Sequence, residues 1–289
     1  MSWRTVVVAS NAKLSYKNEY MIIRNDEVQM IHLSEIGTLI IDSTAVVITS
    51  YLICELIKNK VKIIYCDNQR NPIGEIIPYY GNYNCSKRLK TQILWDKTST
   101  ETVWTEIIKE KIRNQADMLK YINSDNYKKL YEYLDEVELF DPSNREGHSA
   151  KVYFDSLFGL KFSREDDNDI NASLNYGYSI LLSQFNKMIV ANGLSTELGI
   201  KHINEFNNFN LSSDFMEPFR PIVDKVVYLN KDKTFKENKL ELVNIINHKV
   251  KINNKEQYIT TAIGIYVKSV IKAIEDKDIS KICFFEYEL

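Results

Sequence analysis

The sequence predicts an α+β protein of 289 residues, in which a strand-rich N-terminal part precedes a larger helical part. Up to about residue 80, apolar residues occur in short bursts rich in Val, Ile, Thr and Tyr, as is typical of strands. Beyond about residue 83 the apolar period changes from two to 3.6, which indicates helices. Because no Gly/Ser-rich or Pro-rich tract separates the parts, we expect two adjoining domains with a short linker at residues 78–83.

The strands of the N-terminal part are predicted from its apolar bursts. Asn25-Asp26 lies between two of them and favours a tight turn, because both residues tolerate positive φ. We therefore expect a small antiparallel sheet. Its first strands are predicted at residues 4–9, 13–16, 20–24, 28–33 and 37–41.

A helix is predicted to interrupt these strands. Apolar residues recur at helical spacing from Ala45 to Lys58, and the hydroxyl residues Ser43-Thr44 precede them as a candidate cap. The chain then returns to a buried strand at residues 61–66 and to a last strand near residues 74–78.

The C-terminal part is predicted from its 3.6-residue repeat. Two further helices are expected between about residues 234 and 275, joined by a polar turn near residues 251–255, before a short terminal extension at residues 279–289. The earlier helices are predicted at residues 86–96, 102–122, 126–136, 144–158 and 172–192.

Composition points to a folded protein of the cytoplasm. Hydrophobic residues make up 44% of the chain, with five prolines and nine glycines. We find no secretory leader pattern and no apolar run long enough to span a bilayer, so no membrane partner is expected. The cysteines lack any Cys-x-x-Cys spacing, which argues against disulfides and zinc-thiolate sites and favours buried free thiols. They are Cys54, Cys66, Cys85 and Cys283.

Net charge is −2 over the whole chain, so any attraction to nucleic acid must be local. Basic side chains outnumber acidic ones over residues 81–130, where Lys87, Arg88 and Lys90 form a stripe. Such a stripe favours contact with DNA phosphates, although a solvated helix face is the alternative. Three tyrosines at the domain boundary suit stacking on exposed bases, or else packing. They are Tyr79, Tyr80 and Tyr83.

The segment from Asp214 to Pro221 combines two acids, an arginine and two prolines within eight positions. Asp214 and Glu217 are three apart, so on a helical turn they face the same way. Pro221 is expected to limit how far that helix continues. Two carboxylates beside Arg220 suit a divalent cation that works on a phosphate. Alternatively, Asp214 caps a helix after Ser212-Ser213, and Arg220 pairs with an acid at the surface.

Two other segments carry candidate site residues. Glu146 begins an apolar run three residues after Ser143, which also fits a purely structural capping box. His202 ends the segment that begins at Gly193, and it could instead be a core histidine. One imidazole with two or more carboxylates suits Mg²⁺ or Mn²⁺, and Lys201 and Arg220 are candidate phosphate contacts.

Four motifs in this order resemble the universal CRISPR adaptation integrase family, the first CRISPR-associated protein, and most closely its type II-A form. The resemblance covers essentially the whole chain. The motifs are Glu-Gly-His-Ser-Ala-Lys-Val-Tyr-Phe from Glu146, Leu-Asn-Tyr-Gly-Tyr at residues 174–178, the segment 193–202 ending in Leu-Gly-x-x-His, and Asp214-x-x-Glu217-Pro-Phe-Arg-Pro.

The resemblance implies that Glu146, His202 and Glu217 are the metal ligands, with Mg²⁺ or Mn²⁺ as cofactor, and that Asp214 shares or supports this catalytic role. The sequence departs from the family at two points. Many relatives have Asp at the position of Glu217 and Asp-Pro at the position of Ser195-Thr196, so the loop shape there is open. His148 is not expected to be a ligand, because it points elsewhere on its helix than Glu146.

The resemblance also implies an architecture and an activity. Residues 1–80 are expected to form a small β-rich, sandwich-like dimerisation domain, and residues 81–289 an all-α catalytic domain. The implied enzyme joins the 3′-OH ends of short DNA duplexes to the leader-repeat junction of a CRISPR array by transesterification. A metal-dependent endonuclease that cuts branched or single-stranded DNA and a noncatalytic DNA-binding scaffold are the alternatives.

The resemblance implies several partners besides prespacer and target DNA. The protein is expected to form a homodimer, and a dimer of the small ferredoxin-like second adaptation protein is expected to bridge two such dimers. The RNA-guided effector nuclease and a DNA-end-binding accessory protein are further implied partners.

Overall fold

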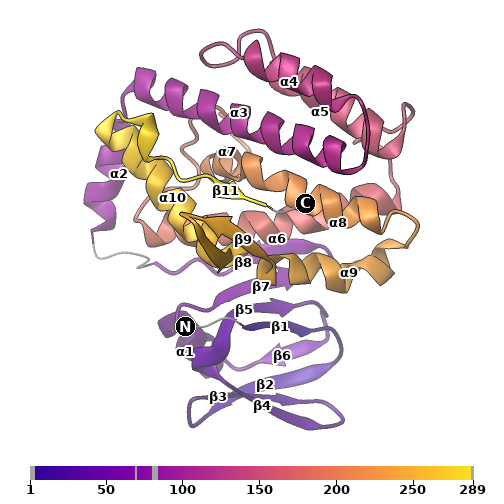
Figure 1. The fold of residues 1–289 in the computed structure, drawn as a ribbon. Coiled ribbons are helices and arrows are strands. Elements are labelled where there is room, and N and C mark those ends of the chain that lie inside the picture. The colour runs from indigo at the N-terminus through magenta and orange to yellow at the C-terminus, as the bar shows by residue number, and fades with distance from the viewer. Residues whose placement is uncertain (1–3, 69, 80–83, 288–289) are drawn as a thin grey trace. The chain divides into compact units, whose positions relative to one another are not determined.

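The computed structural model describes residues 4–68, 70–79 and 84–287 (Figure 1). Contacts between Cα atoms divide the chain into two compact units, residues 1–80 and 81–289. The first unit is strand-rich and the second mostly helical, which is the predicted fold class. The roles of the two units in dimerisation and catalysis stay predictions.

Two four-stranded sheets make up the N-terminal unit. The first has the order β1 (Arg4–Val8), β5 (Ile36–Ile41), β7 (Lys62–Cys66) and β8 (Pro72–Glu75). The second has the order β4 (Val28–His32), β3 (Tyr20–Arg24), β2 (Ala12–Lys17) and β6 (Val46–Ile48).

The prediction of one small antiparallel sheet was wrong. Strands β2, β3 and β4 are antiparallel neighbours, but β1–β5, β5–β7 and β2–β6 are parallel pairs. Turn residues such as Asn25-Asp26 indicate only the pairing of strands that follow each other. Parallel pairs join strands that are distant in sequence, so they follow from packing rather than from turns. Both sheets contribute to one apolar core, as a sandwich-like domain requires.

The first helix is shorter than the sequence predicted. Helix α1 spans Ser50–Lys58, and its cap is Thr49, whose side chain accepts a hydrogen bond from the Leu52 N–H. The preceding Val46–Ile48 segment is strand β6, paired with β2. Its β-branched side chains suit a strand, and this preference prevailed over the helical spacing. Leu52 and Leu56 then anchor α1 in the shared core.

The C-terminal unit is built around two long helices, α3 (Lys97–Tyr121) and α6 (Asp169–Ala191). Helix α3 contacts α4, α5, α7, α8 and α10, and α6 contacts α7, α8, α9 and α10. The other helices are α2 (Cys85–Ile93), α4 (Tyr127–Asp135), α5 (Arg145–Phe158), α7 (Asn210–Met216), α8 (Arg220–Leu229), α9 (Phe235–Asn244) and α10 (Ile259–Asp276).

The C-terminal unit is not all-α. Its three-stranded sheet has the order β10 (Lys255–Tyr258), β9 (Lys249–Ile252) and β11 (Phe285–Glu286). The predicted polar turn lies in this sheet as a β-hairpin, and Asn253 and Asn254 both have positive φ. Buried Val250 and Ile252 alternate with exposed lysines in β9, a period-two signal too short to stand out between two helices.

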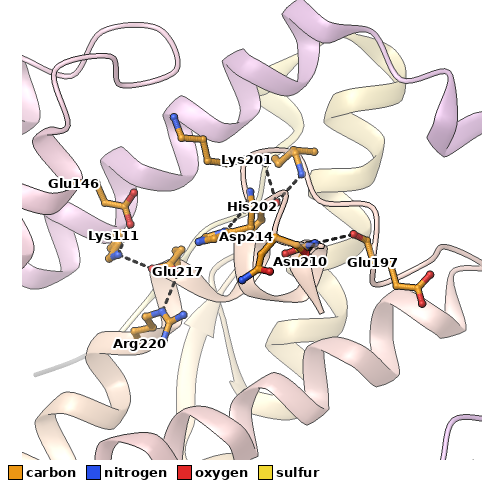
Figure 2. A network of polar contacts seen from close by, with 11 residues as sticks. Lys111, Glu146, Glu197, Lys201, His202, Asn210, Asp214, Glu217 and Arg220 are labelled. Carbon is orange, nitrogen blue, oxygen red and sulfur yellow. Dashed lines mark hydrogen bonds and ion pairs between the residues drawn. The ribbon is translucent and has the colours of Figure 1, made fainter. Parts of the chain in front are cut away.

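The acidic segment is a chain of three short elements rather than one helix. Helix α7 ends at Met216, a single 3₁₀ turn follows at Glu217–Phe219, and α8 begins at Arg220. Pro221 therefore does not end a helix as expected. It lies in the first turn of α8, where its missing N–H leaves no helical hydrogen bond unmade. The end of α7 lies between the two acids, and Figure 2 shows Asp214 directed at His202 whereas Glu217 is directed at Lys111 and Arg220.

Two other predictions from composition can be compared with the structure. The four cysteines are free thiols, but only Cys66 is buried, and Cys54 is exposed. Across the described ranges, every helix falls short of the combined length and apolarity that crossing a membrane requires.

Candidate functional site

A polar cluster forms where α3, α5 and the α7–α8 segment meet, and it includes most of the predicted site residues (Figure 2). Helix α3 supplies Lys111 and α5 supplies Glu146, while Glu217 and Arg220 flank the break before α8. The loop ahead of α7 adds His202. The sequence motifs are thus brought together by tertiary packing within one unit.

Glu217 is buried among positive charges. Its Oε1 accepts a hydrogen bond from Arg220 Nε at 2.9 Å, and its Oε2 lies 2.5 Å from Lys111 Nζ. The second contact is a buried ion pair in which the Lys111 ammonium group faces this oxygen. Burial by itself raises the pKa of Glu217, but Arg220 and Lys111 outweigh it and bring that pKa to about 2. Glu217 is therefore a buried anion held by two cationic side chains.

Glu146 is free to use its carboxylate in the site, because other residues cap α5. The Asn144 side chain accepts from the Gly147 N–H, and the Asp141 carboxylate accepts from the N–H groups of Arg145 and Glu146 at 2.8 and 2.9 Å. The capping-box alternative with Ser143 is therefore wrong. Instead, Glu146 Oε1 accepts from Lys111 Nζ at 2.7 Å.

Asp214 holds His202 and the loop that carries it. Its Oδ2 accepts from the N–H groups of Ile200 and Lys201 at 2.6 and 3.1 Å, and its Oδ1 accepts from the His202 N–H at 3.1 Å. Asp214 is fully buried inside α7, so it is not the helix cap considered from sequence.

The ring of His202 is oriented by the same carboxylate. Nδ1 lies 2.6 Å from Asp214 Oδ1, and this hydrogen bond raises the pKa of His202. The ring packs edge-on against Trp104. Because Nδ1 is engaged, Nε2 is the nitrogen that remains for a metal or substrate, an arrangement common around metal-binding histidines. His202 is therefore an oriented, half-buried imidazole rather than a core histidine.

The Leu-Gly-x-x-His motif has a steric reason. A Cβ atom on Gly199 would lie 2.3 Å from the His202 carbonyl oxygen and 2.9 Å from Asp214 Oδ2. Only glycine permits the backbone to fold this closely around Asp214. Ser195 and Thr196 anchor the start of the loop. Ser195 exchanges backbone hydrogen bonds with the Gln92 side chain, and Thr196 Oγ1 donates to the Asn208 carbonyl oxygen.

Lys111 is a central member of the site that sequence reasoning missed. Its side chain is nearly buried, and its Nζ contacts both Glu146 and Glu217. Burial lowers the pKa of Lys111, but the two carboxylates outweigh it and raise that pKa. Its position in the sequence could have indicated this role, because Lys111 lies one helical turn from buried Ile107 and Ile108 in α3. A charged residue on an apolar helix stripe needs a buried partner.

A small pocket of about 220 Å³ adjoins this cluster. Arg220 lies over the Tyr178 ring at 4.7 Å, and Arg164 lies 5.6 Å from the centre of the same ring. The Tyr178 hydroxyl donates a hydrogen bond to Asp224. Burial raises the pKa of Asp224 to about 6. The pocket is lined by Lys111, Gln115, Ala150, Phe154, Arg164, Tyr178, Glu217, Arg220 and Asp224.

His202 borders a different and larger hollow of about 630 Å³. Its walls include Gln92, Trp95, Gly199 and Asn210. His202 and Glu217 therefore line separate hollows.

Within residues 4–68, 70–79 and 84–287, no three His, Cys, Asp or Glu side chains are grouped closely enough to hold a metal ion as they stand. The donor chemistry nevertheless fits a hard divalent cation. Glu146 and Glu217 already share one cationic group, and His202 is oriented through Nδ1. Their assignment as metal ligands stays a prediction.

The predicted DNA-contact residues differ in their solvent exposure and in the partners of their side chains. Lys87 and Lys90 are exposed, whereas Arg88 pairs with Glu275 at 2.7 Å and donates to the Asn192 carbonyl oxygen. Lys201 donates to the Phe140 carbonyl oxygen at 3.0 Å, so its ammonium group is already engaged by the fold. Arg220 is in the site itself.

Three further sequence predictions concern aromatic and imidazole rings. Tyr79 is 97% exposed, as a stacking residue needs, while Tyr80 and Tyr83 lie outside the described residues. His148 is exposed beside the Tyr133 ring, consistent with its not being a ligand. DNA contact by any of these residues stays a prediction.

The chain was compared with curated proteins and solved structures. A CRISPR-associated endonuclease Cas1 from Neisseria meningitidis serogroup C (strain 8013) is 32% identical, covering 96% of this chain and 94% of the relative. A casposase bound to its integration product shares the fold with a TM-score of 0.78 at 22% identity, covering 100% and 95% of the two chains. A chain of a Cas6-RT-Cas1–Cas2 complex aligns with a TM-score of 0.74 at 15% identity.

The last alignment covers 96% of this chain but only 36% of the longer one. At these identities the two structures establish the fold alone. Membership of a family is established by sequence. The model of the family described as CRISPR associated protein Cas1 matches residues 5–244, and the Neisseria relative matches almost end to end. The chain therefore belongs to the Cas1 family.

Proposed function

We propose that this protein is a metal-dependent DNA integrase of CRISPR adaptation, which joins the 3′-OH ends of short duplex DNA to a leader-repeat junction by transesterification. One observation carries the proposal. Glu146 and Glu217, from distant parts of the chain, hold carboxylate oxygens 2.7 and 2.5 Å from a single cationic nitrogen, and an oriented His202 lies beside them (Figure 2).

The residues divide the work of such a reaction. A bound Mg²⁺ or Mn²⁺ neutralises developing charge on the scissile phosphate and lowers the cost of presenting an attacking oxygen. Glu146, Glu217 and His202, through its Nε2, would hold that cation. Asp214 keeps the imidazole in place through Nδ1, and Arg220, on the rim of the small pocket, is positioned to bind phosphate oxygens. Positioning and charge then account for catalysis.

The proposal includes the partners expected from the family. The Cas6-RT-Cas1–Cas2 complex contains both adaptation proteins, and we extend this pairing to a homodimer of this chain with the small ferredoxin-like protein. The effector nuclease and an end-binding protein are proposed as further partners, and the cytoplasm as the site of action.

An endonuclease is the second candidate, favoured by the description of the Neisseria relative. The same residues accept water in place of a sugar hydroxyl, so product analysis separates the two reactions. Joined species identify an integrase, and exclusively shortened species identify an endonuclease. DNA binding without any chemistry, equal in EDTA and Mn²⁺, identifies a scaffold.

The test uses a labelled duplex with free 3′-OH ends, a leader-repeat plasmid and the partner protein. We expect joined product with Mn²⁺ and none with EDTA. His202→Ala and Glu217→Gln are each expected to lower joining at least about a hundredfold. His148→Ala is the matched control, because His148 is exposed beside Tyr133 and outside the site. Normal joining by both site variants removes this site from the reaction.

A further inference from the structure

We propose that Lys111 is a built-in competitor for the metal. In the metal-free protein its ammonium group holds Glu146 and Glu217 together, and a divalent cation binds by displacing it. The proposal rests on the proposed function in one respect, because it takes these two glutamates as metal ligands.

Position is the first argument. Lys111 Nζ lies 2.7 Å from Glu146 Oε1 and 2.5 Å from Glu217 Oε2. Mg²⁺ binds carboxylate oxygens at about 2.0–2.1 Å. A cation that contacts both oxygens at this distance from the side that Nζ occupies would overlap the ammonium group. The two cannot be present together.

Charge is the second argument. Two carboxylates, from Glu146 and Glu217, face two cationic side chains, from Lys111 and Arg220. The cluster is balanced without a metal. A divalent cation added to it would leave excess positive charge where Glu217 is only 3% exposed, and uncompensated buried charge is costly. Binding is therefore favourable only if a cationic side chain leaves.

Mobility decides which side chain leaves. Arg220 is fixed by its Glu217 contact and by stacking on Tyr178 at 4.7 Å. Lys111 carries its charge on a flexible four-carbon stem, and it lines the pocket of about 220 Å³ beside the cluster. That hollow gives the displaced ammonium group a place to go while Arg220 remains.

If Lys111 forms a purely structural ion pair, its removal has the opposite effect on metal affinity. If Lys111 only braces α3 against α5, its removal disorders the carboxylates and weakens metal binding. If Lys111 competes, its removal strengthens metal binding, because the binding-competent state no longer needs the ammonium group to leave.

The experiment titrates the full-length protein with Mn²⁺ in the absence of DNA, by isothermal titration calorimetry. Lys111→Met is expected to lower the Kd at least about tenfold. Lys109→Met is the matched control on the same helix, since Lys109 pairs with Glu106 outside the cluster, and it should leave the Kd unchanged. Glu217→Gln should abolish binding.

Thermal unfolding gives a second test. Without metal, Lys111→Met should melt about 5 °C lower than the wild type or more, and Mn²⁺ should raise its Tm more than that of the wild type.

Each outcome bears on one claim. Wild-type binding that is lost in Glu217→Gln but not tightened in Lys111→Met overturns the competition alone. Binding that is absent from every protein, or equally tight in Glu217→Gln, overturns the proposed metal site and the competition with it.

A wild-type measurement covers the case in which Lys111→Met does not fold. Amine labelling followed by peptide mass spectrometry should show Lys111 becoming more reactive when Mn²⁺ is added, with Lys109 unchanged. Constant or reduced reactivity of Lys111 overturns its displacement.

Discussion

Asp214 and Glu217 are three residues apart in one acidic segment, yet the structure surrounds them differently. Asp214 accepts hydrogen bonds from three backbone N–H groups and contacts His202 Nδ1, so both of its oxygens are occupied. Glu217 is held by Arg220 and Lys111, and its Oε2 faces the Lys111 ammonium group. The acid that is fixed by backbone donors is committed to the fold. The acid that is fixed by side-chain charges keeps an oxygen that a cation can take.

The different hydrogen-bond partners assign separate roles to Asp214 and Glu217, although the sequence of this segment alone predicts the same role for both acids. Asp214 is a positioning residue, because it sets the loop and the imidazole and has no oxygen left to give. Glu217 is the better candidate for a ligand, because its partners are themselves cations and one of them has room to move. The criterion is physical and can be tested by removing each acid in turn.

The largest expected effect is that of Asp214→Ala on stability. The substitution leaves three partly buried N–H groups without their acceptor and empties a fully buried site, and we expect a loss of about 4 kcal/mol in the free energy of unfolding. Urea unfolding without metal, followed by circular dichroism, measures it. Glu197→Ala is the control, because Glu197 is exposed in the same loop, and it should change stability by less than about 0.5 kcal/mol. A loss below about 1 kcal/mol for Asp214→Ala contradicts its structural role.

Ionisation of Glu217 should make the free energy of unfolding depend on pH in the acid range. Its pKa is about 2 in the folded protein, below the ordinary glutamate pKa of 4.5, so its ionised form stabilises the fold. This contribution is complete above about pH 5 and is lost as pH falls toward 2, for a total of about 3 kcal/mol.

The measurement compares unfolding free energies of the wild type and Glu217→Gln from pH 2 to pH 7. The wild type should lose about 3 kcal/mol more than the variant over the acid range, because glutamine does not titrate. Parallel curves would show that the cationic neighbours of Glu217 do not stabilise its charge.

Much of the fold and part of the site could be predicted from sequence, because both depend on local patterns. The helical repeat located α3 and α6, and the β-rich bursts located β1 to β5 within a few residues. Strand β6 was missed because Val46–Ile48 also matches a helical repeat, and its pairing with β2 decided the outcome. The hairpin of β9 and β10 was missed because four-residue strands carry little periodic signal.

The site shows the same limit. Glu146, His202 and Glu217 were found because they recur in motifs, and the resemblance grouped them. Lys111 belongs to none of the quoted motifs, and only the packing of α3 against α5 and the α7–α8 segment brings it between two of these acids. The cap of α5 was misassigned for a related reason, since Asp141 reaches the helix from outside the expected Ser143–Glu146 spacing.

The same criterion, applied to the basic stripe of α2, gives the smallest expected effect. Arg88 is committed to Glu275 and Asn192, whereas Lys87 and Lys90 are exposed. We therefore expect Lys87→Ala with Lys90→Ala to weaken duplex DNA binding less than about tenfold and to reduce the slope of log affinity against log salt by up to about 1.8. Arg88→Ala should leave that slope nearly unchanged and instead lower stability by about 1–2 kcal/mol, because it loosens α2. Fluorescence anisotropy between 50 and 200 mM salt distinguishes these results. If the double variant keeps the wild-type slope while Arg88→Ala lowers it, then Arg88 contacts DNA even though its side chain is paired within the protein. In that case, a residue that stabilises the fold can also contribute to function.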